Sequence, residues 1–541
     1  MSSSKSRWNR VCVERTILFT LATIFMMSTL FVEDCASADT KILLEAKTYI
    51  YKNKIDLQGK TICFAKGCII NFNGGTLYNG KIEFDSTAIL GHPHFENCIF
   101  SGSIVIDKID DRDFKSQDDT GTFKFLFNNA VNNGIRCDFY RSYNINMGKI
   151  EGEPAFMTFD SIDSGADIFF HGNKLSNIYS FKIPTIKAII LLRNAKNISI
   201  HNLFFHDADA HNCHYFQKSA GCTFIQCYGD CEAINLLDCR QENGDCIFRS
   251  GVWMHNKKYS EDTPSRGLIK SKLHVSSLNT GYGLALYCGD SLDIKIKAEN
   301  THRGFYCTGV SNSNIVYNGY NPKETKTHIL IKDAVYKKKD INGIDTIDMK
   351  GCNNLKIYAQ IDELLPNEKI ITFQSYGSGR KEKADFCFRS GKCHHHDIDF
   401  SAKIKKFPNK GYYIISNFLP DSGALDDEDM YGCKVTGLMI HDIGNIGGSA
   451  NRYMCNIESY TDVDIKIKDC AKSSKEYGYD LQLVGNCRGN INVSNGKCPN
   501  VLVRKKTTGR FNINAQFDSK FIGTVNYIND GSSKDLVTIT H

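Results

Sequence analysis

The sequence predicts an all-β protein built as a parallel β-helix, a solenoid in which each coil lays short strands on those of the previous coil. Segments that alternate apolar and polar residues recur, often at intervals near twenty residues. They span residues 197–200, 293–296, 314–317, 354–357, 397–400, 464–467, 490–493 and 512–515. Strict alternation indicates a short strand with one buried face. Repetition near a fixed period indicates one supersecondary unit per coil. Irregular polar stretches, rather than the tight turns of hairpins, separate most of these strands.

Length and composition agree with this architecture. The chain has 541 residues, with 43 Gly and only 9 Pro. A solenoid grows along one axis, so a chain of this length need not split into several globular cores. One stretch, residues 122–131, has helical character and follows Asp118-Asp119-Thr120, whose side chains can accept from the first turn of a helix. We expect one short helix there, covering an end or a flank of the solenoid.

The first 38 residues are typical of an export signal. An uncharged, mostly apolar run at residues 16–32 precedes the small-residue cleavage site Ala36-Ser37-Ala38. The basic residues ahead of that run are Lys5, Arg7, Arg10 and Arg15. The run is short for a bilayer span of about 20 residues. We expect a cleaved signal peptide, no stable membrane span afterwards, and a secreted, periplasmic or cell-surface protein of a bacterium. A retained membrane anchor is the alternative.

Three regions are predicted along the chain. Residues 1–38 are the signal peptide. Residues 39–110 contain short strands bounded by Gly turns and form N-terminal β-helical coils. Residues 111–541 form the main parallel β-helix. The charged stretch at residues 107–116 is predicted to be a linker.

Cysteine is abundant, with 22 residues. Cys12 and Cys35 fall in the signal, and the densest cluster lies between Cys213 and Cys246. Export permits disulfides, so we expect buried thiols and a few bridges, with a connectivity that the sequence does not fix. A zinc site is not expected, because paired C-x-x-C spacing is absent.

The formal net charge of +6 is small for a chain of this length. Nucleic acid is not a predicted partner, because no concentrated basic stripe with interleaved aromatic residues is present. The charge is compatible with an acidic polysaccharide partner, although a solvated Lys-rich face also explains it. The oligomeric state is not fixed by the sequence.

One region resembles the start of the pectate lyase superfamily module. It comprises Gln117-Asp118-Asp119-Thr120, the predicted helix, and the run from Gly134 to Ile145 that contains Tyr143. Later coils such as residues 196–203 also resemble that family, and the resemblance covers about two thirds of the chain. It implies a right-handed parallel β-helix. The fold hosts lyases, hydrolases, epimerases and binding proteins, so the resemblance does not choose a reaction.

Polar residues recur at one turn of successive predicted coils. Asn243, Asn279 and Asn300 fall at this turn and predict an Asn ladder, because Asn tolerates the left-handed backbone. The residues just after the turn are Asp230, Asp245, Tyr282 and Arg303. Stacked coils are about 4.8 Å apart, so we expect these four side chains to line one groove.

Such a line suits sugar chemistry. Two carboxylates serve a retaining hydrolase at about 5 Å and an inverting hydrolase at about 6.5–9.5 Å. In an enzyme, Asp245 would be the general acid/base or a Ca²⁺ ligand, and Asp230 would be its partner. Arg303 would neutralise a uronate carboxylate. Gly244-Asp245-Cys246 resembles part of the polygalacturonase motif. The alternative is that these are surface turn residues paired with one another, and no other cofactor is predicted.

A polar insertion at residues 253–266 interrupts the coil rhythm, and insertions in repeats often form the binding face. Trp253 and Tyr259 can stack on sugar rings, or Trp253 can pack under its own loop. The predicted substrate contacts are Arg249, Trp253, His255, Tyr259, Arg266 and His302. Two His-containing clusters, residues 206–214 and 394–396, are weaker metal or acid/base candidates.

The leading functional expectation is an exported carbohydrate-active protein that cleaves an acidic or complex polysaccharide, as a lyase or a glycoside hydrolase. Two alternatives remain open: a non-catalytic glycan-binding or surface scaffold protein, and a sugar epimerase on the same fold.

Overall fold

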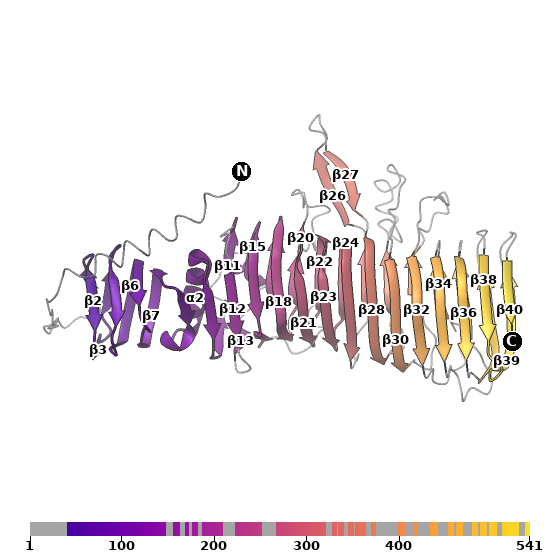
Figure 1. Ribbon diagram of the computed structural model, residues 1–541, viewed down its shortest axis with the longest axis horizontal. Helices are drawn as coiled ribbons and strands as arrows, with labels where there is room; N and C mark the ends of the chain where they lie inside the picture. Colours follow the sequence, from indigo (N-terminus) through magenta and orange to yellow (C-terminus); the bar gives the residue numbers. More distant parts are fainter. Residues whose placement is uncertain are drawn as a thin grey trace, which may run out of the picture.

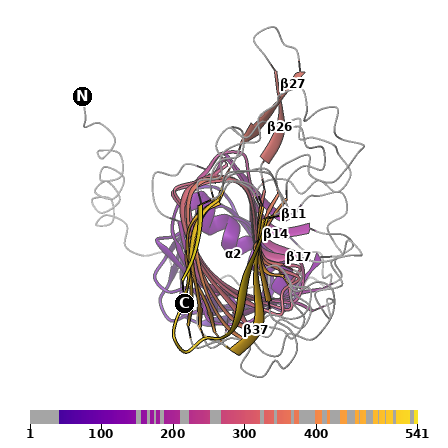
Figure 2. The ribbon, with the colours of Figure 1, turned by 90° about the vertical axis from the view of Figure 1, so that its right-hand side faces the viewer.

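The protein is described by a computed structural model that covers residues 41–147, 155–162, 168–172, 176–181, 187–208, 222–250, 267–320, 327–332, 334–339, 345–350, 352–363, 369–374, 398–406, 415–418, 433–441, 453–458, 461–468, 479–484, 487–494, 497–505, 511–529 and 536–540. In these segments the protein is all-β, with mostly parallel strands and one α-helix. The strands stack side by side along the long axis (Figure 1). Viewed along that axis, they outline a closed cross-section (Figure 2).

The first sheet contains parallel strands only. Its strands are β1 (Lys41–Leu44), β2 (Thr48–Tyr51), β3 (Lys54–Asp56), β4 (Thr61–Phe64), β5 (Ile69–Phe72), β6 (Thr76–Leu90) and β7 (Phe95–Val105). Alternate residues are buried, and their rings stack from coil to coil: the Phe64 and Phe84 centroids lie 5.8 Å apart. The apolar half of the alternating pattern therefore builds the interior.

The recurring alternating segments form one continuous parallel ladder, here called the β9–β40 ladder. It runs through β9 (Arg136–Phe139), β12 (Ile168–Gly172), β15 (Lys196–His201), β18 (Cys231–Glu242), β21 (Lys272–Leu278), β23 (Asp293–Glu299), β24 (Arg303–Tyr320), β28 (Asn353–Glu363), β30 (Ile398–Lys406), β32 (Cys433–His441), β34 (Thr461–Lys468), β36 (Cys487–Ser494), β38 (Phe511–Phe517) and β40 (Leu536–Thr540). Lys272 pairs with Asp293 and Asp293 with Asn314, a spacing of 21 residues at each step. The predicted strands and their near-twenty-residue spacing are confirmed here.

A second parallel ladder, the β11–β31 ladder, carries the candidate site. It contains β11 (Ala155–Asp160), β14 (Lys187–Arg193), β17 (Cys222–Tyr228), β19 (Cys246–Ser250), β22 (Tyr282–Asp290), the start of β24, β25 (Thr327–Lys332), β29 (Lys369–Gln374) and β31 (Ile415–Phe418). The remaining parallel strands are β8 (Lys108–Asp110), β10 (Tyr143–Asn146), β13 (Asn177–Phe181), β16 (Phe204–Asp207), β20 (Leu268–Ile269), β33 (Tyr453–Glu458), β35 (Tyr479–Val484), β37 (Lys497–Lys505) and β39 (Ile522–Asn529).

An antiparallel hairpin departs from this pattern. It consists of β26 (Ala334–Lys339) and β27 (Asp345–Lys350), and it projects from the stack (Figures 1 and 2). Its first strand, AVYKKK, lacks the alternation that marks the parallel strands, so the repeat pattern does not predict it.

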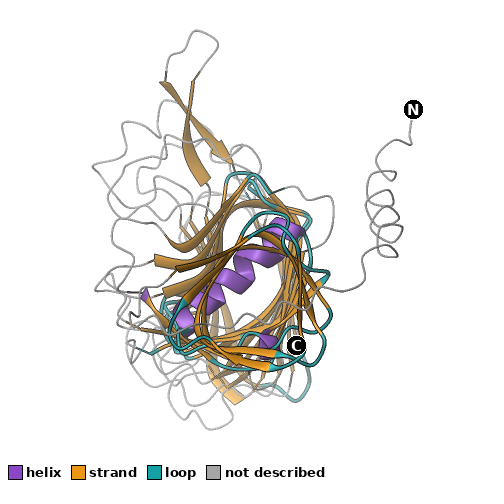
Figure 3. Ribbon diagram, turned by 90° about the vertical axis from the view of Figure 1, so that its left-hand side faces the viewer, coloured by secondary structure: helices purple, strands orange, loops and turns teal. Residues whose placement is uncertain are grey.

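The predicted short helix is present as α2 (Asp119–Asn133). The Asp118 side chain caps it by accepting from Gly121 N, and Gly134 ends it in the left-handed conformation with φ 63°. The helix does not cover an end of the molecule. It lies across the cross-section between β7 and β12 (Figures 1 and 3), where the Phe127 ring stacks on Phe170 at 4.0 Å between centroids. Buried Phe side chains on the helix explain this internal position.

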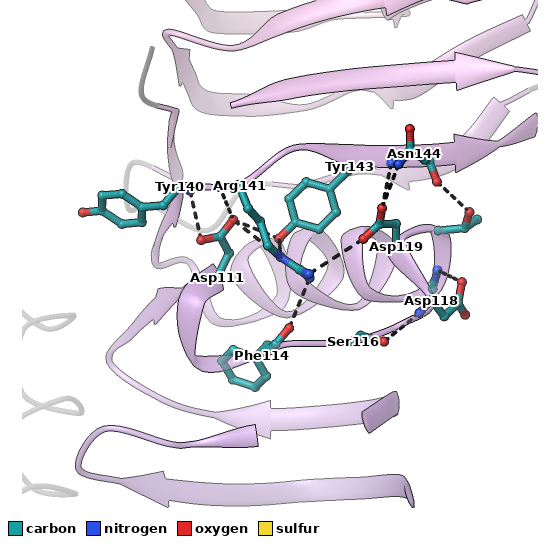
Figure 4. Close-up of polar contacts among 11 residues, drawn as sticks. Asp111, Phe114, Ser116, Asp118, Asp119, Tyr140, Arg141, Tyr143 and Asn144 are labelled. Atoms are coloured by element: carbon teal, nitrogen blue, oxygen red, sulfur yellow. Dashed lines mark hydrogen bonds and ion pairs between the residues drawn. The ribbon is translucent and has the colours of Figure 1, made fainter. Parts of the chain in front are cut away.

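The predicted linker at residues 107–116 is wrong. This stretch contains β8 and a 3₁₀ turn, η1 (Asp111–Asp113), and Asp111 has 0% of its surface exposed. Figure 4 shows the Asp111 carboxylate facing the backbone of Tyr140 and Arg141 and the hydroxyl of Tyr143. Arg141 continues the network to the backbone oxygen of Phe114. The charged sequence is therefore an internal polar junction rather than a solvated connection.

The predicted Asn ladder is present. Asn243, Asn279 and Asn300 all have left-handed backbones, with φ of 62°, 54° and 49°. The Asn300 Nδ2 donates to Asn279 Oδ1 at 2.7 Å. The ladder therefore both fits the turn and ties one coil to the next.

Replacing Asn300 with alanine should lower the free energy of unfolding by about 1–2 kcal/mol. The variant loses a hydrogen bond worth about 0.5–1.5 kcal/mol and places alanine in a left-handed backbone. Asn300→Gly is the matched control, because glycine tolerates that backbone. Urea unfolding should show a smaller loss for the glycine variant, and equal losses would contradict a backbone contribution.

No described helix is long and apolar enough to cross a membrane. The predicted signal peptide, residues 1–38, lies outside the described residues. The break between the first sheet and the long sheet falls between Val105 and Lys108. The division of the chain into domains stays a prediction.

Candidate functional site

A polar cluster lies at β17, β19, β22 and β24 of the β11–β31 ladder. Thr223, Cys246, Tyr282 and Arg303 are register partners on these successive strands. Three residues farther along, the partners are Gln226, Arg249, Ala285 and Tyr306. Cys246, Tyr282 and Ala285 form an apolar cluster with Tyr306 that is separate from the main core. This small cluster is therefore distinct from the main core.

Asp245 anchors this cluster at the start of β19. Its Oδ2 accepts from Thr223 Oγ1 at 2.7 Å and from Arg249 Nη2 at 2.5 Å. Asp245 is 1% exposed and Arg249 is 3% exposed, so this ion pair is buried. The other carboxylate oxygen, Asp245 Oδ1, has no hydrogen-bond partner among the described residues. Asp245 is thus a buried ion-pair partner, not an exposed turn residue.

Tyr282 joins the cluster to Arg303. The Arg303 Nη1 donates to the Tyr282 hydroxyl at 2.7 Å, and the guanidinium carbons of Arg249 and Arg303 each lie 5.5 Å from the Tyr282 ring centroid. Burial raises the pKa of Tyr282 to about 12, although both arginines lower it. The phenol is therefore protonated at neutral pH, which suits a hydrogen-bond donor or general acid rather than a base.

Arg303 is the solvent-reaching member of the cluster. Its side chain is half-buried, whereas Asp245, Arg249 and Tyr282 are buried. Among the described residues, no carboxylate lies within ion-pair distance of Arg303, whose side-chain partner is Tyr282. A guanidinium can hold a carboxylate or phosphate with two parallel hydrogen bonds.

Asp230 does not belong to this cluster. Asp245 N donates to the carbonyl of Cys222, the first residue of β17. Asp230 follows the other end of β17, where its N–H donates to Asn194 Oδ1. A strand of this length spans about 20 Å, beyond the separation of any glycosidase pair. The two carboxylates cannot act on one bond, nor can they ligate one Ca²⁺ ion.

A second carboxylate, Asp207, lies near this cluster. The sequence places it instead in the His-containing cluster of residues 206–214. The Asp207 Oδ2 accepts from Cys222 N at 2.8 Å, and a Cβ added to Gly244 would meet that oxygen at 2.9 Å. Asp207 is 2% exposed. It therefore lies beside the corner that precedes Asp245. Asp207 and Gly244 are brought together by the order of the strands around the coil. The alternation of apolar and polar residues does not reveal that order.

The thiol of Cys246 is not a nucleophile. Burial raises the pKa of Cys246 to about 12, and its Sγ donates to the carbonyl of Phe248 at 2.8 Å. A thiol in this state is protonated and inert at neutral pH. Among the described residues, no three His, Cys, Asp or Glu side chains gather to hold a metal ion.

His302 lies one residue before Arg303 and is 6% exposed. The backbone N–H of His302 donates to the carbonyl of Thr280, and the backbone N–H of Tyr282 donates to the carbonyl of Asp245. Asp245, Gly281 and His302 each immediately precede a strand, β19, β22 and β24 respectively. The other predicted contacts, Trp253, His255, Tyr259 and Arg266, lie outside the described residues, as do Asp209, His211, His214 and residues 394–396.

Comparisons with protein-family models, with curated proteins and with solved structures find no match to this chain.

Proposed function

We propose that this chain is an exported right-handed parallel β-helix that binds an acidic polysaccharide across the outer surface of β17, β19, β22 and β24. The observation that carries the proposal is Arg303, a half-buried guanidinium held by Tyr282 without an acidic partner in the described part of the chain.

The arrangement around Arg303 favours recognition of a carboxylate or sulfate group. The fork of a guanidinium matches either anion with two parallel hydrogen bonds. Tyr282 holds one arm of that fork, and the buried Arg249–Asp245 pair lies beneath the Tyr282 ring. The buried residues therefore position Arg303, and their limited exposure argues against direct contact with a polymer.

The surface also has the form that a linear polymer requires. Parallel strands repeat at about 4.8 Å along the stack, so groups on neighbouring coils present a regular row. The hairpin of β26 and β27 leaves the stack directly after β25, the neighbour of β24. Its sequences, AVYKKK and DTIDMK, carry four lysines and two aspartates. The hairpin begins beyond Lys332, the partner of Thr308, so it lies at the opposite end of β25 from Thr327, the partner of Arg303. Its net positive charge favours an acidic ligand over a neutral one.

Three observations favour a right-handed parallel β-helix. Strands pair with strands two or three places later in the sequence, as in β11 with β14 and β14 with β17. Parallel crossover connections are right-handed in the great majority of proteins. The segment from Gln117 to Ile145 resembles the pectate lyase superfamily, whose members have this handedness.

Cleavage of the polysaccharide is the second candidate function. Asp245 Oδ1 is buried without a hydrogen-bond partner among the described residues, and Asp207 lies across Cys222 from it. Both acids are buried, with Asp245 1% and Asp207 2% exposed. Reducing-sugar release would indicate cleavage, and ultraviolet absorbance of an unsaturated uronate would distinguish a lyase from a hydrolase.

Binding to a polyuronate should weaken about 10-fold or more in Arg303→Gln, which corresponds to at least about 1.4 kcal/mol. Arg303→Lys should fall between this variant and the parent protein, because lysine keeps the charge but not the fork. Calorimetric titration against a uronate polymer and a neutral glucan measures both variants. Lys295→Gln, an exposed lysine on β23, is the matched control and should bind as the parent does.

The proposal fails if Arg303→Gln retains full affinity for the polyuronate. It also fails if the parent protein binds the neutral glucan equally well, or if binding does not weaken as salt is added.

A further inference from the structure

Two pairs of buried cysteines lie at the same corner of the stack, on different coils. In each pair one cysteine lies before the corner and the other lies after it. Cys227 lies near the end of β17 and Cys231 begins β18. Cys307 lies in the corresponding part of β24, and Cys352 immediately precedes β28. All four side chains are buried, with at most 2% of their surface exposed.

The strand register places the second member of each pair in one row. Cys231 is the partner of Leu268, Leu268 of Gly289, and Gly289 of Val310. Ser311 pairs with Asn353, so Cys352 lies beside Val310, and its Sγ is 3.4 Å from Val310 N. Cys231 and Cys352 therefore occupy equivalent corners on different coils.

The thiols within each pair are neighbours. The Sγ of Cys231 lies 3.7 Å from the carbonyl oxygen of Leu192, the strand partner of Cys227. A side-chain hydrogen bond with Cys227 lowers the pKa of Cys231. Burial raises the pKa of Cys307, and a side-chain hydrogen bond with Cys352 raises it further. Each pair thus has a thiol–thiol contact.

Two other buried cysteines have backbone acceptors, as Cys231 does, but no described cysteine shifts the pKa of their thiols. The Cys239 Sγ donates to the carbonyls of Ile200 and Leu237 at 3.3 and 3.7 Å. The Cys98 Sγ donates to the carbonyls of Leu77 and Glu96 at 3.5 and 3.3 Å. These thiols are satisfied by the backbone, and they provide internal controls.

We propose that Cys227–Cys231 and Cys307–Cys352 become two intrachain disulfides when the chain folds in the presence of a small-molecule disulfide. In each reaction the two cysteine thiols lose two protons and two electrons and one S–S bond forms. The small disulfide gains them and is cleaved to two thiols. All four sulfurs are buried in the folded chain, out of reach of a small disulfide, so the bridges form during coil closure and not afterwards.

The bridges would fasten the corner at the far end of the strands that carry the candidate site. Cys307 lies four residues after Arg303 on β24, and Cys352 leads into β28. The Cys307–Cys352 bridge closes the segment that contains the β26–β27 hairpin. A covalent link there holds the base of the hairpin to the strand that carries Arg303.

Refolding of the full-length reduced chain with oxidised and reduced glutathione tests the proposal. After alkylation of remaining thiols and digestion with trypsin and chymotrypsin, mass spectrometry should find Cys227 linked to Cys231 and Cys307 linked to Cys352. Chymotrypsin can cut after Tyr228, which separates the first pair onto two peptides. Protein refolded without oxidised glutathione should show neither link and melt several degrees lower.

Cys231→Ser and Cys352→Ser should each remove only their own bridge, and Cys239→Ser should remove neither. The proposal is overturned if folded protein from the oxidising refolding carries all four residues as alkylated thiols. It is equally overturned if these cysteines link to partners other than those named.

Discussion

Replacing Asp245 with asparagine should lower the free energy of unfolding by about 3–5 kcal/mol, the usual cost of removing one member of a buried ion pair. Asp245 is 1% exposed and its Oδ2 accepts from the buried guanidinium of Arg249. Asparagine would leave that guanidinium without a counter-charge. Urea and thermal unfolding of the purified variant measure the loss.

A matched control separates this effect from ordinary loss of surface charge. Asp238→Asn replaces an exposed aspartate whose φ of 56° also suits asparagine, and it should change stability by less than about 0.5 kcal/mol. Combining Asp245→Leu with Arg249→Met should recover much of the stability lost in Asp245→Asn, because both charges are then absent. Equal stability of Asp245→Asn and the parent would contradict a structural role for the pair.

This result bears on how the site works. If Asp245 were an exposed turn residue, as its place after a predicted turn suggests, its removal would affect activity without affecting folding. The structure instead makes Asp245 and Arg249 a support for Tyr282, and Tyr282 a support for Arg303. Loss of ligand binding in Asp245→Asn would therefore accompany lost stability, whereas Arg303→Gln should lose binding with little change in stability.

The main ladder could be predicted from the sequence because its signal is local. A strand with one buried face needs an apolar side chain at every second position. The segments 293–296 and 314–317 show this alternation, and they pair directly in β23 and β24. The helix was equally local, since Asp118 and Gly134 are recognisable at its two ends. In each case the residues that specify the element lie within it.

The candidate site could be predicted only in part, because it depends on alignment between coils. Tyr282 and Arg303 are neighbours in the structure, and a similar Asn turn precedes both. Asp230 also follows a turn, but at the other end of β17. A coil has several turns, and the number of residues in each turn decides which turns of successive coils align. The alternation of apolar and polar residues within strands does not give that number. Asp245 and Arg249 share a strand face four residues apart, a spacing that would have revealed their ion pair.

The junction below α2 was mistaken for a linker because charge alone is ambiguous. A charged stretch is normally solvated, yet Asp111 has no exposed surface. The donors that satisfy it come from Tyr140, Arg141 and Tyr143, which lie about thirty residues later in the sequence (Figure 4). Nothing within residues 107–116 indicates these partners.

Replacing Asp111 with alanine should lower the free energy of unfolding by at least about 3 kcal/mol. Its Oδ1 accepts from Tyr140 N at 2.9 Å, and its Oδ2 accepts from Arg141 N at 3.2 Å and from the Tyr143 hydroxyl at 3.0 Å. Each buried donor left without an acceptor costs about 1–3 kcal/mol. Asp113→Ala, on the same 3₁₀ turn, is the control and should cost less. Comparable losses in the two variants would indicate that the carboxylate contacts do not hold this junction.

The same carboxyl group should make stability depend on pH. Burial raises the pKa of Asp111 from 3.8 to about 6, against the lowering effect of its three hydrogen-bond donors. A folded pKa above the unfolded value means that protonation favours the folded state. The contribution is fully present below pH 3.8 and is lost as the pH rises through 6. The stability of the parent relative to Asp111→Asn should therefore increase by about 2 kcal/mol between pH 7.5 and pH 4. Parallel stability curves for the two proteins over that range would show that Asp111 does not titrate as its burial requires.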